Sequence, residues 1–265
     1  GGGVTGRKIM TAAASNFKKV TLELGGKSPN IIFADADQNL ALEYAMFGIF
    51  AGQGEVCSAG SRLLLERSLA DSFLPRLAAA CEKVVVGPGL EAGTEMGPLI
   101  SRAHQKKVIA YIQAGHEEGA ELLCGGGAYT DHRAVGNFVQ PTIFTNARPN
   151  MRIVREEIFG PVLVVQLFDT EEEALRLAND SIYGLAGGVF TSDASRAQRV
   201  IRGLRAGITW INCYHPTFNE APWGGYKQSG IGRELGTYGY DAYTEVKQIT
   251  HCINPQPLGW FKNLA

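Results

Sequence analysis

Short β-branched runs alternate with longer segments of helical period along most of the chain. Such an alternation is typical of an α/β domain built on a mainly parallel sheet. The runs that we expect to form strands are 20–24, 30–34, 62–66, 120–124, 161–168, 187–191 and 207–212. Helices are expected between them, because parallel strands need long crossover connections that are usually helical.

Two of these helices have clear amino-terminal signals. Thr170 and Glu173 stand at capping-box spacing ahead of an apolar face, which predicts a helix over residues 170–179. Asp193 is a suitable cap for the next helix, and the strand that begins near Gly207 follows it. The strand-helix-strand order is typical of a doubly wound sheet.

The end of the chain departs from this alternation. Residues 212–236 are rich in Gly, Pro and aromatics and have no period, which favours a functional loop or a domain crossing. Residues 243–253 alternate enough to predict a strand, and the apolar residues up to Trp260-Phe261 would be poorly placed in water. We interpret this end as an oligomerisation element, with a simple packed terminus as the alternative.

Composition narrows the class of protein. With 265 residues, 45% of them hydrophobic, the chain can bury a core, and 25 Lys plus Arg against 26 Asp plus Glu give no field that attracts nucleic acid or an anionic membrane. No apolar run is long enough to span a bilayer and no secretory signal is evident, so a cytoplasmic location is expected. Because the chain opens at three glycines without Met, we expect it to come from a longer protein.

The cysteines give no sign of a disulfide framework or a metal site. They are odd in number, widely separated and without a CxxC pair, so we interpret them as reduced thiols and expect no bound metal. The five are Cys57, Cys81, Cys124, Cys213 and Cys252.

Cys57 has the sequence context of a nucleophile. It lies on a glycine-flanked turn between an expected helix that begins near Asn39 and the expected strand at Arg62. A thiol on such a turn is accessible, whereas Cys81 lies in an apolar helical run typical of a structural cysteine. A core cysteine remains the alternative for Cys57.

Glu23 is a candidate general base. It lies near the end of a hydrophobic strand and is followed by Leu24 and two glycines, which allow backbone or ligand to approach closely. A carboxyl group among apolar neighbours has a raised pKa and can act as a base near neutrality. The alternative is a carboxylate that points to solvent.

The segments around this carboxylate and this thiol resemble the two signature motifs of the aldehyde dehydrogenase superfamily, in the family's order and at its usual separation. Residues 22–29 read LELGGKSP and residues 52–62 read GQGEVCSAGSR. Residues 156–161 (EEIFGP) match a third motif, and residues 222–230 (PWGGYKQSG) with 232–236 (GRELG) match a fourth. The resemblance runs along essentially the whole chain, is closest to betaine-aldehyde-type members, and covers the family's later portion.

The resemblance implies a covalent mechanism. In that family a cysteine thiolate adds to the aldehyde carbon, the resulting thiohemiacetal passes hydride to a nicotinamide, and water hydrolyses the thioester. Cys57 would then be the nucleophile, with its own N–H in the oxyanion hole, and Glu23 the base that activates the thiol or the water. Glu234 matches a carboxylate that helps to relay the base's proton, with an ordinary surface glutamate as the alternative.

The resemblance also implies NAD as cofactor, with NADP possible. Glu157 matches the residue that bonds the nicotinamide ribose, and Phe159 matches the ring that packs beside the nicotinamide. Leu24 matches a residue whose backbone faces the cofactor, and Gly1 and Gly2 match a glycine-containing cofactor turn. A turn residue and a core aromatic are the alternatives for Glu157 and Phe159.

The aromatic loop resembles the family's substrate funnel. Trp223 and Phe218, together with Val56 beside the nucleophile, are the residues that we expect to contact the aldehyde. Trp223 suits a quaternary ammonium group, through a cation–π attraction of about 1–2 kcal/mol when desolvated, so betaine aldehyde or an amino aldehyde is the expected substrate. His215 has no obvious Ser or Cys partner and is interpreted as structural.

The expected organisation is an aldehyde dehydrogenase catalytic domain over residues 25–225. Residues 1–24 are interpreted as a remnant of the NAD-binding domain, and residues 226–265 as a crossing segment and oligomerisation tail. A core divided in this way exposes a sheet edge and apolar surface, so we expect the chain to be less stable than its parent or to need a partner. A homo-oligomer, a dimer or tetramer, is the expected assembly. Alone, this polypeptide is expected to bind NAD poorly and to turn over little.

Two other functions fit the same residues. In the first, the chain is a non-catalytic assembly module whose tail pairs with another subunit. In the second, Cys57 and Glu23 act as a cofactor-independent thioesterase or esterase without hydride transfer. Ester hydrolysis without NAD that disappears in Cys57→Ala would support the second.

Overall fold

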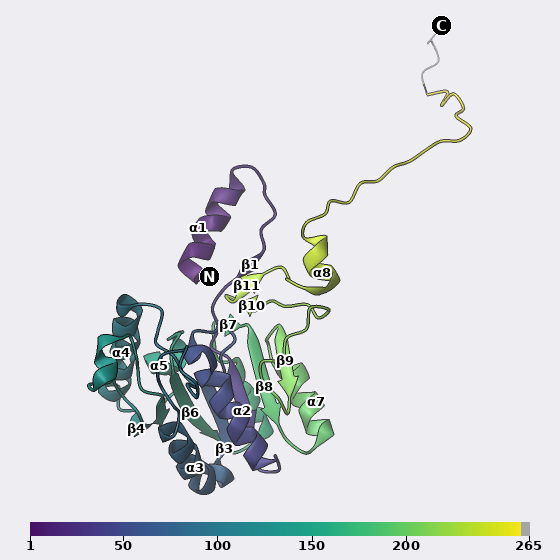
Figure 1. Ribbon diagram of the computed structural model, residues 1–265. Helices are drawn as coiled ribbons and strands as arrows, with labels where there is room; N and C mark the ends of the chain where they lie inside the picture. Colours follow the sequence, from purple (N-terminus) through teal and green to yellow (C-terminus); the bar gives the residue numbers. More distant parts are fainter. Residues whose placement is uncertain (261–265) are drawn as a thin grey trace.

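The central sheet confirms the predicted α/β class. The computed structural model describes residues 1–260, and within them seven strands form one sheet in the order β4-β5-β6-β3-β2-β8-β9 (Figure 1). All neighbours pair in parallel except β4 and β5. The sheet strands are β2 (Pro29–Ile32), β3 (Arg62–Glu66), β4 (Glu121–Cys124), β5 (Thr142–Thr145), β6 (Val162–Phe168), β8 (Ala186–Phe190) and β9 (Ile208–Ile211).

Short strands and helices surround this sheet. Two antiparallel pairs lie outside it, made of β1 (Leu22–Glu23) with β11 (Gly230–Ile231) and β7 (Tyr183–Gly184) with β10 (Tyr226–Lys227). The helices are α1 (Gly3–Ala14), α2 (Gln38–Phe50), α3 (Ala70–Glu82), α4 (Arg102–Glu117), α5 (Arg152–Arg155), α6 (Glu171–Asn179), α7 (Ala194–Gly203) and α8 (Gly236–Asp241). Three 3₁₀ turns are η1 (Ala51–Gly54), η2 (Arg67–Leu69) and η3 (His132–Val135) in the described residues.

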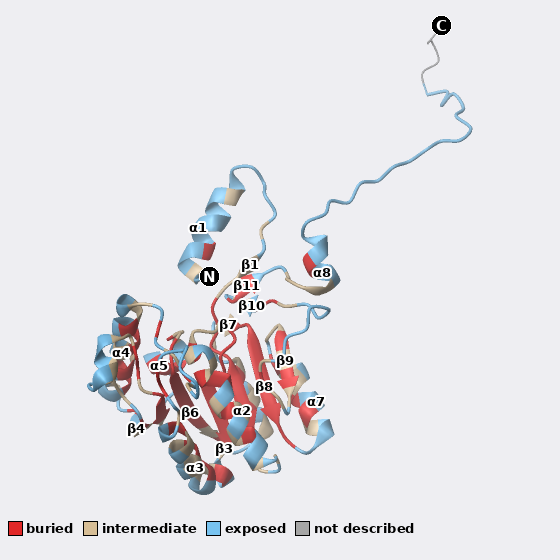
Figure 2. Ribbon diagram, viewed as in Figure 1, coloured by how far each residue is buried: buried red, intermediate tan, exposed pale blue. Residues whose placement is uncertain are grey.

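Alternating side chains of the strands divide the core into two layers. Leu63 and Leu65 of β3 pack with α2 and α3 on one face, whereas Leu64 packs with α6 and α7 on the other. Helices α4 and α5 extend that second layer over β5 and β6. Because both faces are covered, the strands are buried almost continuously (Figure 2).

The structure confirms the predictions made for one strand and for the amino-terminal caps of two helices. The strand predicted at 62–66 forms with those bounds, and Thr170 caps α6 by accepting a hydrogen bond from the Glu173 N–H at 3.2 Å. The Glu173 carboxylate accepts from the Asp169 N–H at 3.0 Å, so the reciprocal bond of the capping box is displaced by one residue. Asp193 caps α7 as predicted.

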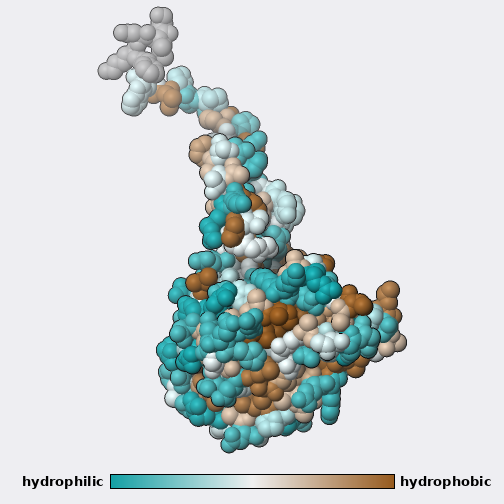
Figure 3. Space-filling model, turned by 90° about the vertical axis from the view of Figure 1, so that its left-hand side faces the viewer, coloured by the Kyte–Doolittle hydropathy of each residue, from teal (hydrophilic) through white to brown (hydrophobic). Residues whose placement is uncertain are grey.

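The strand predicted over residues 243–253 does not form within the single chain. These residues leave the body as an exposed segment without β pairing, with Val246 101% and Ile249 83% exposed (Figure 1). Alternation favours a strand only where another strand supplies the ladder of hydrogen bonds, and no described part of this chain does so. Figure 3 shows hydrophobic residues along this projecting tail, and Trp260 is 81% exposed, while Phe261 lies outside the described residues.

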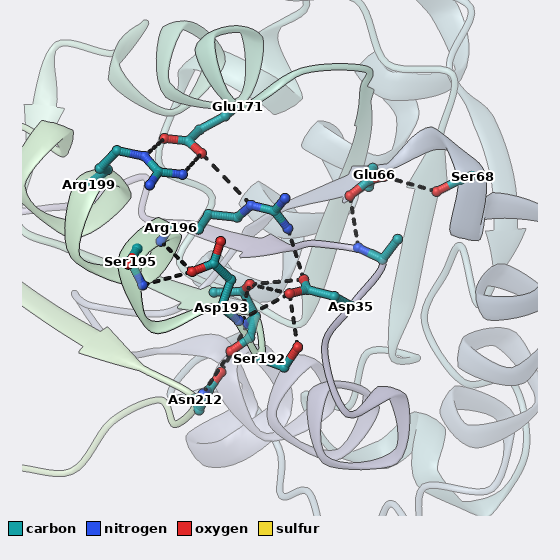
Figure 4. Close-up of polar contacts among 12 residues, drawn as sticks. Asp35, Glu66, Ser68, Glu171, Ser192, Asp193, Ser195, Arg196, Arg199 and Asn212 are labelled. Atoms are coloured by element: carbon teal, nitrogen blue, oxygen red, sulfur yellow. Dashed lines mark hydrogen bonds and ion pairs between the residues drawn. The ribbon is translucent and has the colours of Figure 1, made fainter.

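Polar residues join the loops at the carboxyl edge of the sheet. Asp35, which follows β2, accepts hydrogen bonds from the hydroxyls of Thr191 and Ser192, from the Asp193 N–H and from Arg196 (Figure 4). Although partial burial opposes it, these bonds lower the pKa of Asp35. Ligands usually bind at the carboxyl edge of the sheet in such folds. Here the Asp35 carboxylate at that edge is instead hydrogen-bonded to other residues of the chain.

Candidate active site

Cys57 lies at the amino edge of the sheet, on the turn that leads into β3. Gly52, Gln53 and Gly54 all have positive φ angles, which reverses the chain after α2. At Gly54 a Cβ would stand 2.2 Å from the carbonyl oxygen of Gly160, so only glycine lets the two turns meet. The turn of Cys57 is thereby fixed against the turn that leads into β6.

The two glycines after Leu24 bring a second carboxylate to this place. The Gly26 N–H donates to Oε1 of Glu157 at 3.0 Å. A Cβ on Gly25 would overlap the Glu157 carboxylate, and one on Gly26 would stand 2.4 Å from the Cys57 carbonyl oxygen. The motifs that contain Glu23, Cys57 and Glu157 are therefore in contact through their backbones.

A cavity of about 610 Å³ opens between these turns. The structure brings Cys57 and Val56 together with Glu157, Phe159 and the first two glycines in its wall. Leu24 is not in the wall, because its side chain packs against Gly6 of α1. The lining residues are Gly1, Gly2, Glu55, Val56, Cys57, His104, Lys107, Glu157 and Phe159.

Glu23 is carried by β1, close enough for its charge to act on the Cys57 thiol. Its antiparallel partner is Gly230 of β11, and a Cβ on Gly224 would stand 3.0 Å from Glu23 Oε1. Trp223 and Glu234 exchange both backbone hydrogen bonds at 2.7 Å, which holds the Glu234 carboxylate in the same region. All three expected catalytic residues thus belong to one end of the sheet.

The electrostatics of these groups are coupled. Burial raises the pKa of Glu23, and the nearby Glu234 raises it further. Burial likewise raises the pKa of the Cys57 thiol, and the charge of Glu23 adds to that rise. Both shifts favour the neutral form of the group relative to its free state, and the charge of each group influences the titration of the other.

The expected aldehyde contacts fall in two places. Trp223 and Phe218 line a second hollow of about 220 Å³, where the Trp223 and Trp210 rings lie 6.4 Å apart. Phe218 is 63% exposed. Cys57 and Trp223 both pack against the aromatic cluster of Trp210 and Tyr214, whereas Val56 lines the larger cavity.

Sequence reasoning missed several polar residues of the site. His104 and Lys107 occupy one face of α4 and line the larger cavity with Glu55. Their i, i+3 spacing is a visible signal, but nothing local shows that α4 covers the turn of Cys57. His215 was expected to lack a Ser or Cys partner, yet its Nδ1 lies 3.5 Å from Ser58 Oγ.

Two basic residues within the motifs of Glu23 and Cys57 are fully buried. Arg62 donates to the backbone carbonyls of Lys27, Leu177 and Ala178. Lys27 is 1% exposed, and its amine has no hydrogen-bond partner among the described residues. Burial, followed by the charge of Arg62, lowers the pKa of Lys27 to about 7.

Comparison with known proteins places this arrangement in a family. The model of the Aldehyde dehydrogenase family matches residues 1–249. The chain belongs to the aldehyde dehydrogenase family. This result confirms the resemblance carried by the four motifs, and it places the thiol and the carboxylates of one cavity within an aldehyde dehydrogenase fold.

Individual aldehyde dehydrogenases are similar along nearly all of the chain. Betaine aldehyde dehydrogenase of Bacillus subtilis is 52% identical over 99% of this chain and 54% of its own length. Peroxisomal aminoaldehyde dehydrogenase 2 of Pisum sativum is 47% identical over 99% of this chain and 52% of its own. The chain spans about half the length of the curated relatives it matches.

A solved structure shares the fold. Betaine aldehyde dehydrogenase from Staphylococcus aureus, in complex with NAD+, superimposes with a TM-score of 0.96 at 50% identity, covering 98% of this chain and 52% of that one. The mainly parallel sheet is therefore that of an aldehyde dehydrogenase. Among residues 1–260, no helix combines the length and apolar character needed to cross a bilayer.

Proposed function

We propose that the chain forms the thiol, base and nicotinamide side of an NAD-dependent aldehyde dehydrogenase that oxidises an aldehyde to a carboxylic acid. The observation that carries this proposal is the shared cavity. Cys57 lies in its wall with Glu157 and Phe159, which come from 100 residues further along the chain. A structural cysteine would not need a carboxylate, a histidine and a lysine around it.

The residues of the cavity fit a nicotinamide nucleotide. Glu157 supplies a half-buried acceptor for ribose hydroxyls, and Phe159 supplies an aromatic face at a residue with φ of +62°. His104 and Lys107 supply donors on the α4 side. When bound there, NAD would supply the hydride acceptor of the oxidation.

The side chains divide the remaining work. Cys57 gives up its proton and bonds to the aldehyde carbon, and the developing oxyanion is stabilised by the Cys57 N–H. Glu23 takes the proton from the thiol, releases it to solvent, and later takes one from the water that hydrolyses the thioester. Its raised pKa suits both tasks, since a carboxyl group with a pKa nearer neutrality is a stronger base.

A cationic aldehyde is the substrate class that we favour. The hollow lined by Trp223 and Phe218 offers aromatic faces to a quaternary or primary ammonium group. The relatives named for betaine aldehyde and aminoaldehyde oxidation support this choice.

We also propose that the chain self-associates through its tail. Residues 243–260 leave large apolar side chains exposed in the single chain, and this favours a partner. Light scattering after gel filtration tests the idea: Val246→Asp combined with Ile249→Asp should lower the mass, whereas the same mass in the variant would argue against it.

Aldehyde-dependent NADH formation tests the proposed activity. Turnover of betaine aldehyde or a simple aliphatic aldehyde by the chain, lost in Cys57→Ala, supports a dehydrogenase. Ester hydrolysis that needs Cys57 but no NAD, without NADH formation, would instead support a thiol esterase. If neither reaction occurs while Cys57 is still readily alkylated, the chain holds the nucleophile without a working cofactor site; a Cys57 that is not alkylated would support the assembly module.

A further inference from the structure

Two cysteines far from the candidate active site lie in contact inside the core. Cys81 is in the last turn of α3 and Cys124 ends the edge strand β4, and their sulfurs are 2.7 Å apart. They are 2% and 7% exposed. Ordinary contacts between nonbonded heavy atoms are roughly 3.5–4.0 Å, so the two thiols form an unusually close pair.

The surroundings hold the two sulfurs toward each other. Both thiols also reach the Pro141 carbonyl oxygen, at 3.5 Å from Cys81 and 4.0 Å from Cys124. Both belong to the layer of core formed by α2 and α3. A disulfide bond is about 2.05 Å long, so closing the gap requires a movement of roughly 0.7 Å.

We propose that Cys81 and Cys124 are a dithiol that a hydroperoxide oxidises to an internal disulfide, joining α3 to the edge strand β4. The site is separate from Cys57, which packs against another cluster. The proposal is independent of the dehydrogenase function, because it concerns only the packing of α3 on β4.

The chemistry balances with the peroxide as the only oxidant. The Cys124 thiolate attacks one peroxide oxygen, the O–O bond breaks, and a sulfenic acid forms as water or an alcohol leaves. The Cys81 sulfur then attacks that sulfenic sulfur, the S–S bond forms, and the hydroxyl leaves as water with the remaining proton. Two thiols lose two electrons, which reduce one peroxide.

The order of attack follows from the thiol pair itself. Cys124 is the more exposed of the two, at 7% against 2%, and it ends the edge strand. Its contact with Cys81 also lowers the pKa of Cys124, so Cys124 is the readier thiolate. Tyr129, a half-buried residue of the loop after β4, packs on the same cluster, so a small oxidant needs this loop or strand β4 to open. Edge strand β4 has exposed residues at Glu121 and Leu122, so opening there disturbs little of the sheet.

Peptide mapping of the peroxide-treated chain tests the proposal. The 265-residue chain receives hydrogen peroxide at the dose that oxidises half of the exposed Cys252, and is then denatured, labelled with a maleimide and digested. The expected product joins the peptides of Cys81 and Cys124, is lighter by two hydrogen atoms, and is lost after dithiothreitol. Full labelling of both thiols at that dose, or a bond from either to Cys57 or Cys213, would overturn the proposal.

Thermal unfolding gives a second readout. The bond closes a loop between residues 43 positions apart, so the melting temperature should rise by roughly 5–10 °C on oxidation. Cys124→Ser should abolish the rise, and Cys213→Ser, the matched control, should keep it. If Cys124→Ser does not fold, the peptide map of the unaltered chain decides alone; a linked product without any rise would mean that the bond does not fasten α3 to β4.

Discussion

Gly26 lies directly against the backbone of Cys57: a Cβ at Gly26 would stand only 2.4 Å from the Cys57 carbonyl oxygen. The N–H of the same glycine donates to Glu157. One small residue therefore sets the distance between the nucleophile's turn and the carboxylate of the cavity. The close approach explains why a glycine is needed here, since backbone atoms cannot yield as a flexible side chain can.

Gly26→Ala should disturb both stability and thiol chemistry. We expect a loss of about 1–3 kcal/mol in the free energy of unfolding, as for other overpacked sites, and a changed rate of Cys57 alkylation. Urea unfolding and iodoacetamide kinetics measure the two effects. Gly89→Ala is the control, because a Cβ there meets nothing within 4 Å; equal behaviour of the two variants would contradict the contact.

Glu23→Gln should make Cys57 more acidic. The negative charge of Glu23 adds to the effect of burial in raising the pKa of Cys57, so its removal should shift the pH profile of alkylation down by a few tenths to about one pH unit. The alkylation rate of Cys57 is measured between about pH 6 and 10, in steps of roughly half a pH unit. Glu172→Gln, at a distant exposed position on α6, should leave the profile in place, and an upward shift in Glu23→Gln would refute the coupling.

Lys27 should make stability depend on pH. Its pKa is about 7 in the folded chain and about 10.4 when unfolded, so between these values the unfolded state binds more protons. Stability contributed by the neutral amine therefore rises with pH through this window, by up to about 1.4 kcal/mol per unit, and is fully lost below the folded pKa.

Lys27→Met removes that titration and tests the sign. We expect the variant to be more stable than the parent at about pH 7 and to have a flatter profile up to about pH 9. Lys106→Met, at an exposed position on α4, is the control. Parallel profiles for Lys27→Met and the unaltered chain, in urea unfolding across this range, would mean that the amine stays charged and paired.

Trp223→Ala should weaken cationic aldehydes selectively. A cation–π contact of about 1–2 kcal/mol corresponds to a loss of roughly tenfold in kcat/KM for betaine aldehyde. The neutral aldehyde of the same shape, 3,3-dimethylbutanal, should lose much less, and Trp223→Phe should be intermediate. Equal losses for both aldehydes would assign Trp223 to packing against Trp210.

Signals within short stretches of sequence correctly predicted helix caps and a strand. The caps at Thr170 and Asp193 and the strand at Arg62 follow from residues within a few positions of each other. Strand β5 escaped prediction because Thr142–Thr145 is short and lies among turns. The tail forms no strand over residues 243–253 in the single chain, because alternation describes a strand's faces and supplies no partner for its backbone.

The sequence indicated which residues belong to the candidate site, but it did not indicate how they are arranged in space. The motifs pointed to Cys57, Glu23 and Glu157. They could not show that the Gly26 N–H donates a hydrogen bond to Glu157, because these positions are 131 residues apart. The contribution of α4 to the cavity, through His104 and Lys107, likewise depends on packing across the sheet. Such long-range contacts leave no period or spacing in the sequence.

The alkylation rate of Cys57 with and without NAD+ tests the shared cavity most directly. Mass spectrometry follows Cys57 and Cys213 in one digest, so each sample contains its own reference thiol. Because Cys57 and Glu157 line one cavity, NAD+ should change the rate at Cys57, leave Cys213 unaltered, and lose its effect in Glu157→Ala. An unchanged Cys57 rate at millimolar NAD+, or equal changes at both thiols, would contradict the account.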